Sequence, residues 1–108
     1  MREIVWMARA DADFQRLYEV REDYLEGLGD RLQIEVVQVL DLIQVFPARW
    51  TIVHPVGFHR AIVGGTFGLI YRIERRGIVL HTMFDLREDP RRIERLLDEL
   101  SRGLQSPD

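Results

Sequence analysis

The second half of the chain carries three apolar segments, and two short turn signals separate them. The first signal is Gly64-Gly65, which supplies the positive φ angles that a tight β-hairpin needs. The second signal is the run Glu-Arg-Arg-Gly at residues 74–77. This pattern predicts three consecutive antiparallel strands, at residues 58–63, 66–73 and 78–84.

The middle strand is the most informative of the three because its side chains alternate in character. One face carries Phe67, Leu69, Tyr71 and Ile73, and the other carries Ile70 and Arg72. A face with four large apolar side chains has to be covered by other elements, so we expect helices to pack on it. Tyr71 is therefore interpreted as a packing residue.

The region before these strands has a helical period. Its apolar residues recur every three or four positions, at Phe14, Leu17, Tyr18, Tyr24, Leu25 and Leu28. We expect Asp11 or Asp13 to cap the start of this helix, after turn-like residues at 8–10. Gly27 and Gly29 mark its end.

A second amphipathic helix follows, with Asp30 as its expected N-cap. Its apolar side is formed by Leu32, Val36, Val39, Leu40 and Ile43. The helix is expected to end near Phe46, because Pro47 disfavours helical backbone angles in the residue before it. The short connection around Gly29 predicts that the two helices form an antiparallel hairpin.

Three shorter segments complete the predicted elements. Residues 3–7 form a β-prone run, which indicates a first strand. Residues 50–53 are interpreted as an extended loop in preference to an edge strand. Asp89 as N-cap, with Pro90 at the first helical position, predicts a last helix.

The predicted fold class is α+β. An N-terminal strand precedes an antiparallel helical hairpin, the hairpin packs on one face of a small antiparallel sheet, and a C-terminal helix ends the domain. We expect one domain over residues 1–108, with a frayed tail at residues 103–108.

Composition excludes several classes of chemistry. The chain has no cysteine, so disulfides, thiolate zinc sites and a cysteine nucleophile are excluded. All its basic residues are arginine, which excludes any mechanism that depends on lysine and favours bidentate contacts with carboxylates or phosphates. No apolar run is long enough to cross a membrane, and the first residues do not resemble a signal peptide. We therefore expect a soluble cytoplasmic protein without membrane association.

Charge is distributed unevenly along the chain. Residues 1–46 hold ten acidic and five basic groups, residues 47–82 hold one and five, and residues 83–108 hold seven and five. The net charges are therefore −5, +4 and −2, which sum to the net −3 of the whole chain. A basic middle on an acidic chain indicates an anionic partner. The overall acidity argues against strong direct binding to DNA, and we expect no sequence-specific DNA binding.

Several spacings together resemble those of a known family. An arginine lies in the opening half of the second predicted strand (residues 58–63), a Phe-x-x-x-Tyr motif lies in the third (66–73), and Asp-Leu-Arg-x-x-Pro follows the fourth (78–84). The matching residues are Arg60, Phe67, Tyr71, Asp85, Arg87 and Pro90. With the order of elements over about residues 3–95, the chain resembles the ParE/RelE superfamily of toxins from type II toxin-antitoxin systems.

The resemblance implies a small toxin that a cognate antitoxin neutralises. Members similar to ParE act on DNA gyrase, whereas members similar to RelE cut messenger RNA on the ribosome. The RelE-like reaction commonly uses a lysine, histidine or glutamate and a tyrosine near the C-terminus, but this chain has no lysine and no tyrosine after Tyr71. We therefore favour the ParE-like branch, which inhibits by binding, over the messenger RNA interferase. A non-toxic interaction module with this fold is the third alternative.

Five arginines are candidates for contact with a target or an antitoxin: Arg60, Arg72, Arg87, Arg91 and Arg92. Arg60 and Arg72 lie on neighbouring predicted strands, where they either bind an anion or are ordinary solvated charges or salt-bridge partners of helix carboxylates. Arg87 lies between two aspartates, so it either fixes the turn into the last helix or contacts a partner. Arg91 and Arg92 lie in the first turn of that helix, where the dipole disfavours cations, and a partner contact explains their position.

For the interferase alternative, the best catalytic set is Arg60, His81 and Arg87, with His81 as the general base. The competing interpretation of His81 is a structural histidine inside the fold. His54 and His59 do not have the spacing of a metal site, because they face opposite sides of any continuous strand. We expect neither a metal nor another cofactor.

Overall fold

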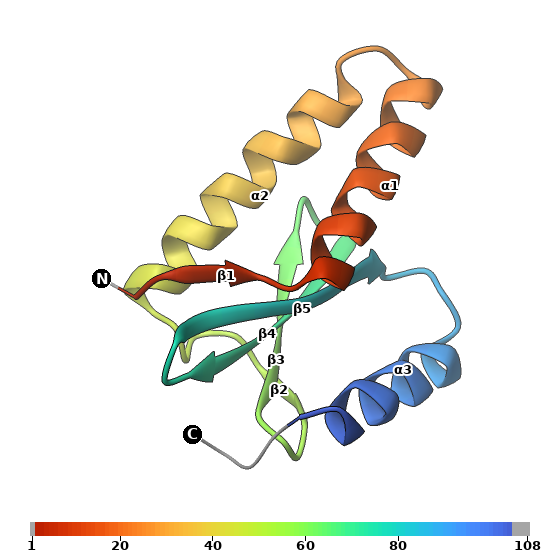
Figure 1. Ribbon diagram of the computed structural model, residues 1–108. Coiled ribbons are helices and arrows are strands. Elements are labelled where there is room, and N and C mark those ends of the chain that lie inside the picture. The colour runs from red at the N-terminus through yellow and green to blue at the C-terminus, as the bar shows by residue number, and fades with distance from the viewer. Residues whose placement is uncertain (1, 105–108) are drawn as a thin grey trace.

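A five-stranded sheet separates a helical hairpin from a C-terminal helix in the computed structural model, which describes residues 2–104 (Figure 1). The sheet has the order β1-β5-β4-β3-β2, with β1 parallel to β5 and the other neighbours antiparallel. The elements are β1 (Ile4–Trp6), α1 (Ala8–Tyr24), α2 (Leu28–Val45), β2 (Ile52–His54), β3 (Phe58–Val63), β4 (Phe67–Glu74), β5 (Gly77–Asp85) and α3 (Pro90–Arg102). The predicted α+β class and order of elements are confirmed.

The meander forms as its turn signals predict. Gly64 and Gly65 have φ angles of 59° and 71°, and they allow β3 and β4 to pair from Val63 opposite Phe67. One feature of β5 is not predictable from alternation. Ile70 pairs with Thr82, whereas the next residue of β4 pairs with Leu80, so His81 is an extra residue in a β-bulge.

The larger core lies between the sheet and the α1–α2 hairpin. The face of β4 that is apolar in the sequence is buried here, and the core contains Leu17, Leu32, Val36, Val39, Ile43, Phe67, Leu69, Tyr71, Ile78, Leu80 and Met83. The apolar side predicted for the second helix is thus the side that packs. Phe46 ends α2 as expected, because Pro47 follows it.

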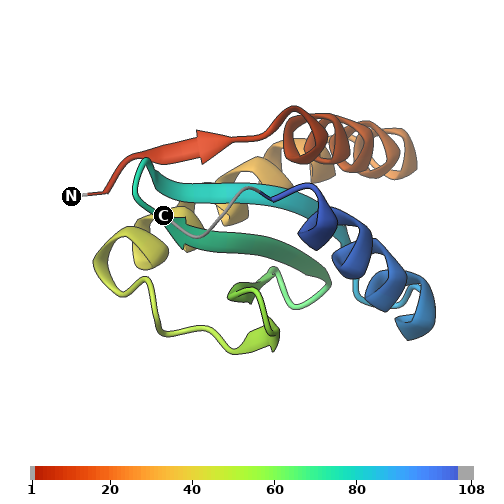
Figure 2. The same cartoon turned by 60° about the horizontal axis from the view of Figure 1, so that its bottom comes forward.

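A smaller core lies on the opposite face of the sheet, under α3 (Figure 2). Phe58, Ile70 and Phe84 supply the sheet side, and Leu97 of α3 packs on them. Asp89 caps α3 by accepting a hydrogen bond from the backbone N–H of Arg91 at 2.9 Å, as the sequence predicts. Both faces of the central strands are therefore covered by helices.

The start of α1 differs from the prediction. The helix begins at Ala8, directly after β1, and its N-cap Met7 makes no side-chain capping bond. Residues 8–10 are therefore helical, in agreement with the high helix propensity of alanine. Neither Asp11 nor Asp13 is the cap, and the carboxylate of Asp13 contacts β5 instead.

The connection between α1 and α2 also differs in detail. It comprises residues 25–27, and Gly27 has a φ of 93° as the N-cap of α2. Gly29 lies inside α2, where a Cβ would be 2.9 Å from a ring carbon of Tyr18. Asp30 is not a cap, and its carboxylate accepts a hydrogen bond from the Tyr18 hydroxyl, which raises the pKa of that tyrosine.

The region predicted as a loop at residues 50–53 contributes an edge strand. Ile52 pairs with His59, and the backbone N–H of Arg60 donates to the carbonyl of Thr51 at 3.0 Å. The loop interpretation is therefore wrong, because the backbone groups on the outer edge of β3 need hydrogen-bond partners and this segment supplies them.

Residues 105–108, most of the tail that we expect to fray, lie outside the described residues. Within residues 2–104, no helix is long and apolar enough to cross a membrane.

Candidate functional site

The two strand arginines of the sequence analysis have different surroundings. Arg72 is largely buried, and its Nε donates to the carbonyl of Val56 at 2.9 Å while its Nη1 lies 3.6 Å from Glu74. Arg60 is exposed on β3. The Cα of Arg60 is paired with Ile70, two residues before Arg72 on β4. Arg72 is thus engaged in contacts inside the fold, and Arg60 is available to solvent.

His81 lies inside the structure. Only 5% of its surface is exposed, its Nε2 is 3.2 Å from the carboxylate of Glu74, and its ring meets the edge of Phe58 with a centroid distance of 5.1 Å. Burial lowers the pKa of His81 below its ordinary value. The same Glu74 carboxylate lies 3.3 Å from Arg76. These contacts bind the end of β4 to the bulge of β5.

Arg87 holds the turn after β5. Its side chain donates to both carboxylate oxygens of Asp85, at 3.0 and 2.7 Å, and its backbone N–H donates to the same group at 2.8 Å. These bonds hold the pKa of Asp85 below its ordinary value. The pair lines a hollow of about 360 Å³ beside the hairpin, where Arg21 lies 4.8 Å from the ring centroid of Phe67. Arg87 and the buried His81 are therefore associated with opposite faces of the sheet.

The arginines at the start of α3 separate as well. Arg91 turns back to Asp89 at 3.5 Å. Arg92 instead lines a groove of about 630 Å³ between α1 and α3. Arg9 and Arg16 of α1 form one wall of this groove, and Arg92 and Arg95 of α3 form the other. We call it the arginine groove.

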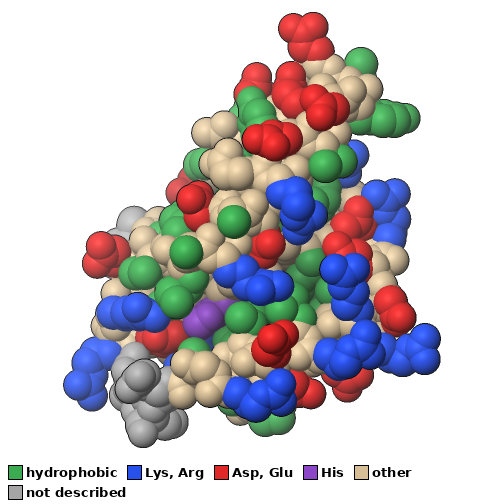
Figure 3. Space-filling view, turned by 45° about the vertical axis from the view of Figure 1, so that its right-hand side comes forward, with side chains coloured by type: hydrophobic (Ala, Val, Ile, Leu, Met, Phe, Trp, Pro, Cys, Tyr) green, Lys and Arg blue, Asp and Glu red, His purple; other side chains and the backbone are tan. Residues whose placement is uncertain are grey.

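The spacing within the helices explains why these side chains share the groove. Arg9, Asp13 and Arg16 are separated by four and three residues, so they lie on one face of α1. Arg92 and Arg95 are three residues apart on α3, and Glu99 follows four residues later. Figure 3 shows basic side chains gathered on this side of the molecule, with acidic side chains among them.

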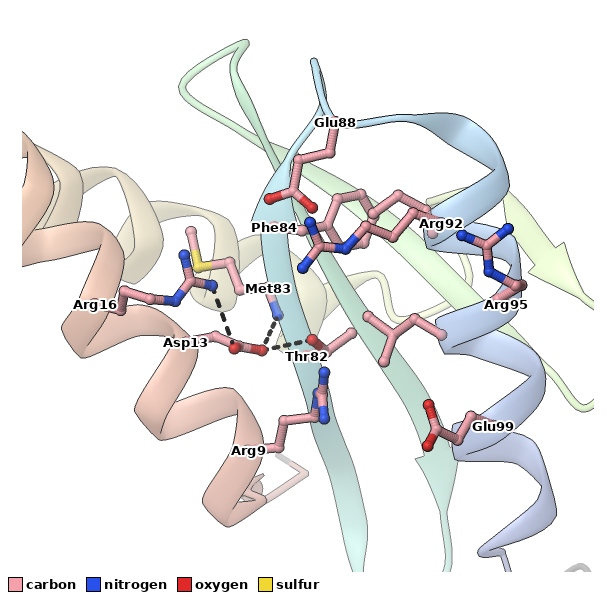
Figure 4. A pocket seen from close by; sticks show the side chains of 12 residues that line it. Arg9, Asp13, Arg16, Thr82, Met83, Phe84, Glu88, Arg92, Arg95 and Glu99 are labelled. Carbon is pink, nitrogen blue, oxygen red and sulfur yellow. Dashed lines mark hydrogen bonds and ion pairs between the residues drawn. The ribbon is translucent and has the colours of Figure 1, made fainter.

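The floor of the groove is the outer edge of β5, at Thr82, Met83 and Phe84. Strand β1 ends at Trp6, which pairs with Leu80, so it does not continue alongside these floor residues. Asp13 supplies the hydrogen-bond acceptor at this edge. Its Oδ2 accepts from the Thr82 hydroxyl at 2.5 Å and from the Met83 N–H at 3.1 Å (Figure 4). Its Oδ1 is 3.5 Å from Arg16. Both oxygens of the Asp13 carboxylate are thus engaged by groups of the protein itself, on β5 and on Arg16.

Three of the four groove arginines have no such ion pair among the described residues. Within residues 2–104, Arg9, Arg92 and Arg95 make no ion pair. In Figure 4, Arg9 and Arg16 extend from α1, and Arg92 from α3, toward the space over Thr82 and Met83. Guanidinium groups arranged around a cleft bind carboxylates or phosphates through paired hydrogen bonds. The arginine groove is therefore a candidate anion-binding site.

Sequence reasoning found one of the four groove arginines, Arg92, and missed Arg9, Arg16 and Arg95. Arg9 lies outside the predicted helix, which begins after residue 10, whereas α1 begins at Ala8. The available signal is the spacing of Arg9, Asp13 and Arg16 once α1 begins at Ala8. The proximity of α1 to α3 has no local signal, since Arg16 on one wall and Arg92 on the other are 76 positions apart in the chain.

No protein-family model matches this chain, and no curated protein matches it in sequence. The function has to be inferred from the residues and their arrangement.

Proposed function

We propose that this protein is the toxin of a type II toxin-antitoxin module, similar to ParE, and that it acts in the cytoplasm by binding and inhibiting DNA gyrase. A cognate antitoxin neutralises it by covering the same surface. In this role the protein is a growth inhibitor that stabilises the genetic element which encodes it, and it cuts no substrate itself.

The observation that carries the proposal is the joint arrangement of the fold and the family-like residues. The order strand, two helices, antiparallel strands and helix supports the resemblance, with the short edge strand β2 as an addition to the three strands that the resemblance implies. Tyr71 is buried on β4, and its hydroxyl donates to the carbonyl of Pro47 at 2.5 Å. Asp85 and Arg87 form the turn that leads to Pro90 and α3. These positions support the resemblance structurally.

The binding mode is supported by what the alternative catalytic set looks like in space. Arg60 is exposed on β3, His81 is buried against Glu74, and Arg87 is bonded to Asp85 on the side of the hairpin. A general base needs access to the proton that it removes. The buried position of His81 therefore favours inhibition by contact over RNA cleavage.

The surface also offers apolar area for a protein partner. Large apolar side chains are exposed along the hairpin: Val20, Tyr24, Leu25, Ile34, Val37, Leu42 and Val45. Tyr24 is 82% exposed, and with Val20 it borders the hollow that contains Arg87. Exposed apolar residues that adjoin charged ones are typical of protein-binding surfaces.

The test is a supercoiling assay with purified protein and purified gyrase on relaxed plasmid DNA. We expect inhibition of supercoiling, and accumulation of cleaved plasmid, at micromolar protein. A parallel reaction with ribosomes and messenger RNA is expected to leave the RNA intact. Unchanged gyrase activity would exclude the proposed target, and ribosome-dependent cleavage that disappears in Arg60→Ala, His81→Ala and Arg87→Ala would establish the interferase instead. If neither activity is present and expression causes no growth defect, the protein is an interaction module without toxicity.

A further inference from the structure

The arginine groove combines a net positive charge, from four arginines and three carboxylates, with a partly apolar floor. Its four arginines are exposed at the surface, whereas Met83 is almost fully buried beneath them and Ile93 and Leu96 are partly exposed. Arg92 lies in the first turn of α3, where a cation opposes the helix dipole and weakens the helix. Arg91 is 3.5 Å from the carboxylate of Asp89, whereas no acidic side chain among residues 2–104 forms an ion pair with Arg92. A residue that the helix itself does not favour is best explained by what it binds.

The acidic residues of the groove restrict the kind of anion. Glu88 and Glu99 lie among the lining residues, and Asp13 lies between Arg9 and Arg16 on the α1 wall. A nucleic-acid backbone carries a negative charge at every nucleotide, so it would be repelled by these carboxylates as it crosses the groove. The chain is also acidic overall, with a net charge of −3. Separate carboxylates on a peptide can meet the arginines individually and avoid the acidic positions.

We infer that the arginine groove binds an acidic, amphipathic segment of a partner protein, whose carboxylates pair with Arg9, Arg16, Arg92 and Arg95 and whose apolar side chains cover Ile93 and Leu96. The identification of this partner as the antitoxin rests on the proposed function. The groove itself requires only a peptide with these properties. The bound segment of the partner lies along the open edge of β5, between α1 and α3.

The test is fluorescence anisotropy with a labelled peptide in which glutamates form one face and leucines the other at helical spacing. The control peptide has glutamine in place of each glutamate, and a labelled oligothymidylate of similar length serves as the nucleic-acid probe. We expect the glutamate peptide to bind more tightly than both controls, and to weaken as salt is added because exposed ion pairs are screened.

The variant Arg9→Gln/Arg92→Gln removes one arginine from each wall, and both side chains are exposed, so the fold is retained. We expect its affinity for the glutamate peptide to be about fivefold to tenfold lower, as the loss of two ion pairs of ordinary strength would give. The matched control is Arg102→Gln, at an exposed position of α3 outside the groove, which is expected to bind as the parent protein does.

Equal binding of the glutamate and glutamine peptides, or an equal loss in Arg102→Gln, would overturn the inference. Groove-dependent binding that is tighter for the oligothymidylate would also overturn it and assign the groove to nucleic acid. These results are separate from the gyrase assay. Gyrase inhibition without binding of the glutamate peptide contradicts only the groove inference. Binding of the glutamate peptide without gyrase inhibition contradicts only the proposed target.

Discussion

Asp13 is the residue on which both the fold of the groove and its charge depend. Its carboxylate accepts hydrogen bonds from the Thr82 hydroxyl and the Met83 N–H, which lie on the outer edge of β5 beyond the end of its pairing with β1. In Asp13→Ala both donors lose their acceptor. A hydrogen bond to a charged group contributes about 1.5–3 kcal/mol. The Asp13 side chain is 15% exposed, so water replaces part of the loss and the lower end of that range applies to each bond.

We therefore expect Asp13→Ala to lower the free energy of unfolding by about 3 kcal/mol. Asp13→Asn keeps an acceptor oxygen but removes the charge, so a loss of about 1 kcal/mol is expected. Both are measured by urea denaturation followed by circular dichroism. The control is Asp11→Ala in the exposed first turn of α1, where only the helix-dipole contribution, below about 1 kcal/mol, is lost.

Although Asp13→Asn lowers stability, it is expected to raise the affinity of the groove for the glutamate peptide. Asp13→Asn raises the net charge of the groove by one and leaves the four arginines in place. The glutamate peptide is therefore expected to bind Asp13→Asn more tightly than the parent protein, although the variant is less stable. The reasoning is refuted if Asp13→Ala is as stable as Asp11→Ala, because Asp13 would then not satisfy the edge of β5.

Three further predictions concern the sheet. Gly77→Ala is expected to destabilise by about 1–3 kcal/mol, because Gly77 has a φ of 134° and a Cβ would meet the carbonyl of Glu3; Gly103→Ala, with ordinary φ, should be nearly neutral in the same denaturation assay. Burial raises the pKa of Tyr71 to about 12, so Tyr71→Phe should remove an ionisation step near that pH from the ultraviolet titration. The pKa of His81 is lower in the folded protein than in the unfolded chain, so the unfolded chain binds a proton more readily. The free energy of unfolding should therefore fall as pH drops below about 6.5. His81→Phe should flatten this dependence, and an unchanged slope would contradict the prediction.

The sequence predicts the parts of the fold that local chemistry determines. Two glycines require a hairpin at residues 64–65, and alternation on β4 identifies the face that the helices cover. Asp89 and Pro90 begin α3 for local reasons too. The bulge at His81 has no such signal, since it depends on how β5 pairs with β4.

The arginine groove is unpredictable for the same reason. Its walls come from opposite ends of the chain, and they meet only because β5 lies between α1 and α3. The loop interpretation of residues 50–53 failed because the edge of β3, which that segment pairs with, is a property of the finished sheet. Segments whose structure depends on distant partners are the ones that local patterns misjudge.

The most direct measurement of the proposed function is the topology of plasmid DNA isolated from bacterial cells after brief expression of the protein alone. Inhibition of gyrase by contact should give relaxed and broken plasmid together with arrested growth, while total messenger RNA stays intact. Fully supercoiled plasmid in arrested cells, with messenger RNA cut on ribosomes, would contradict the proposal.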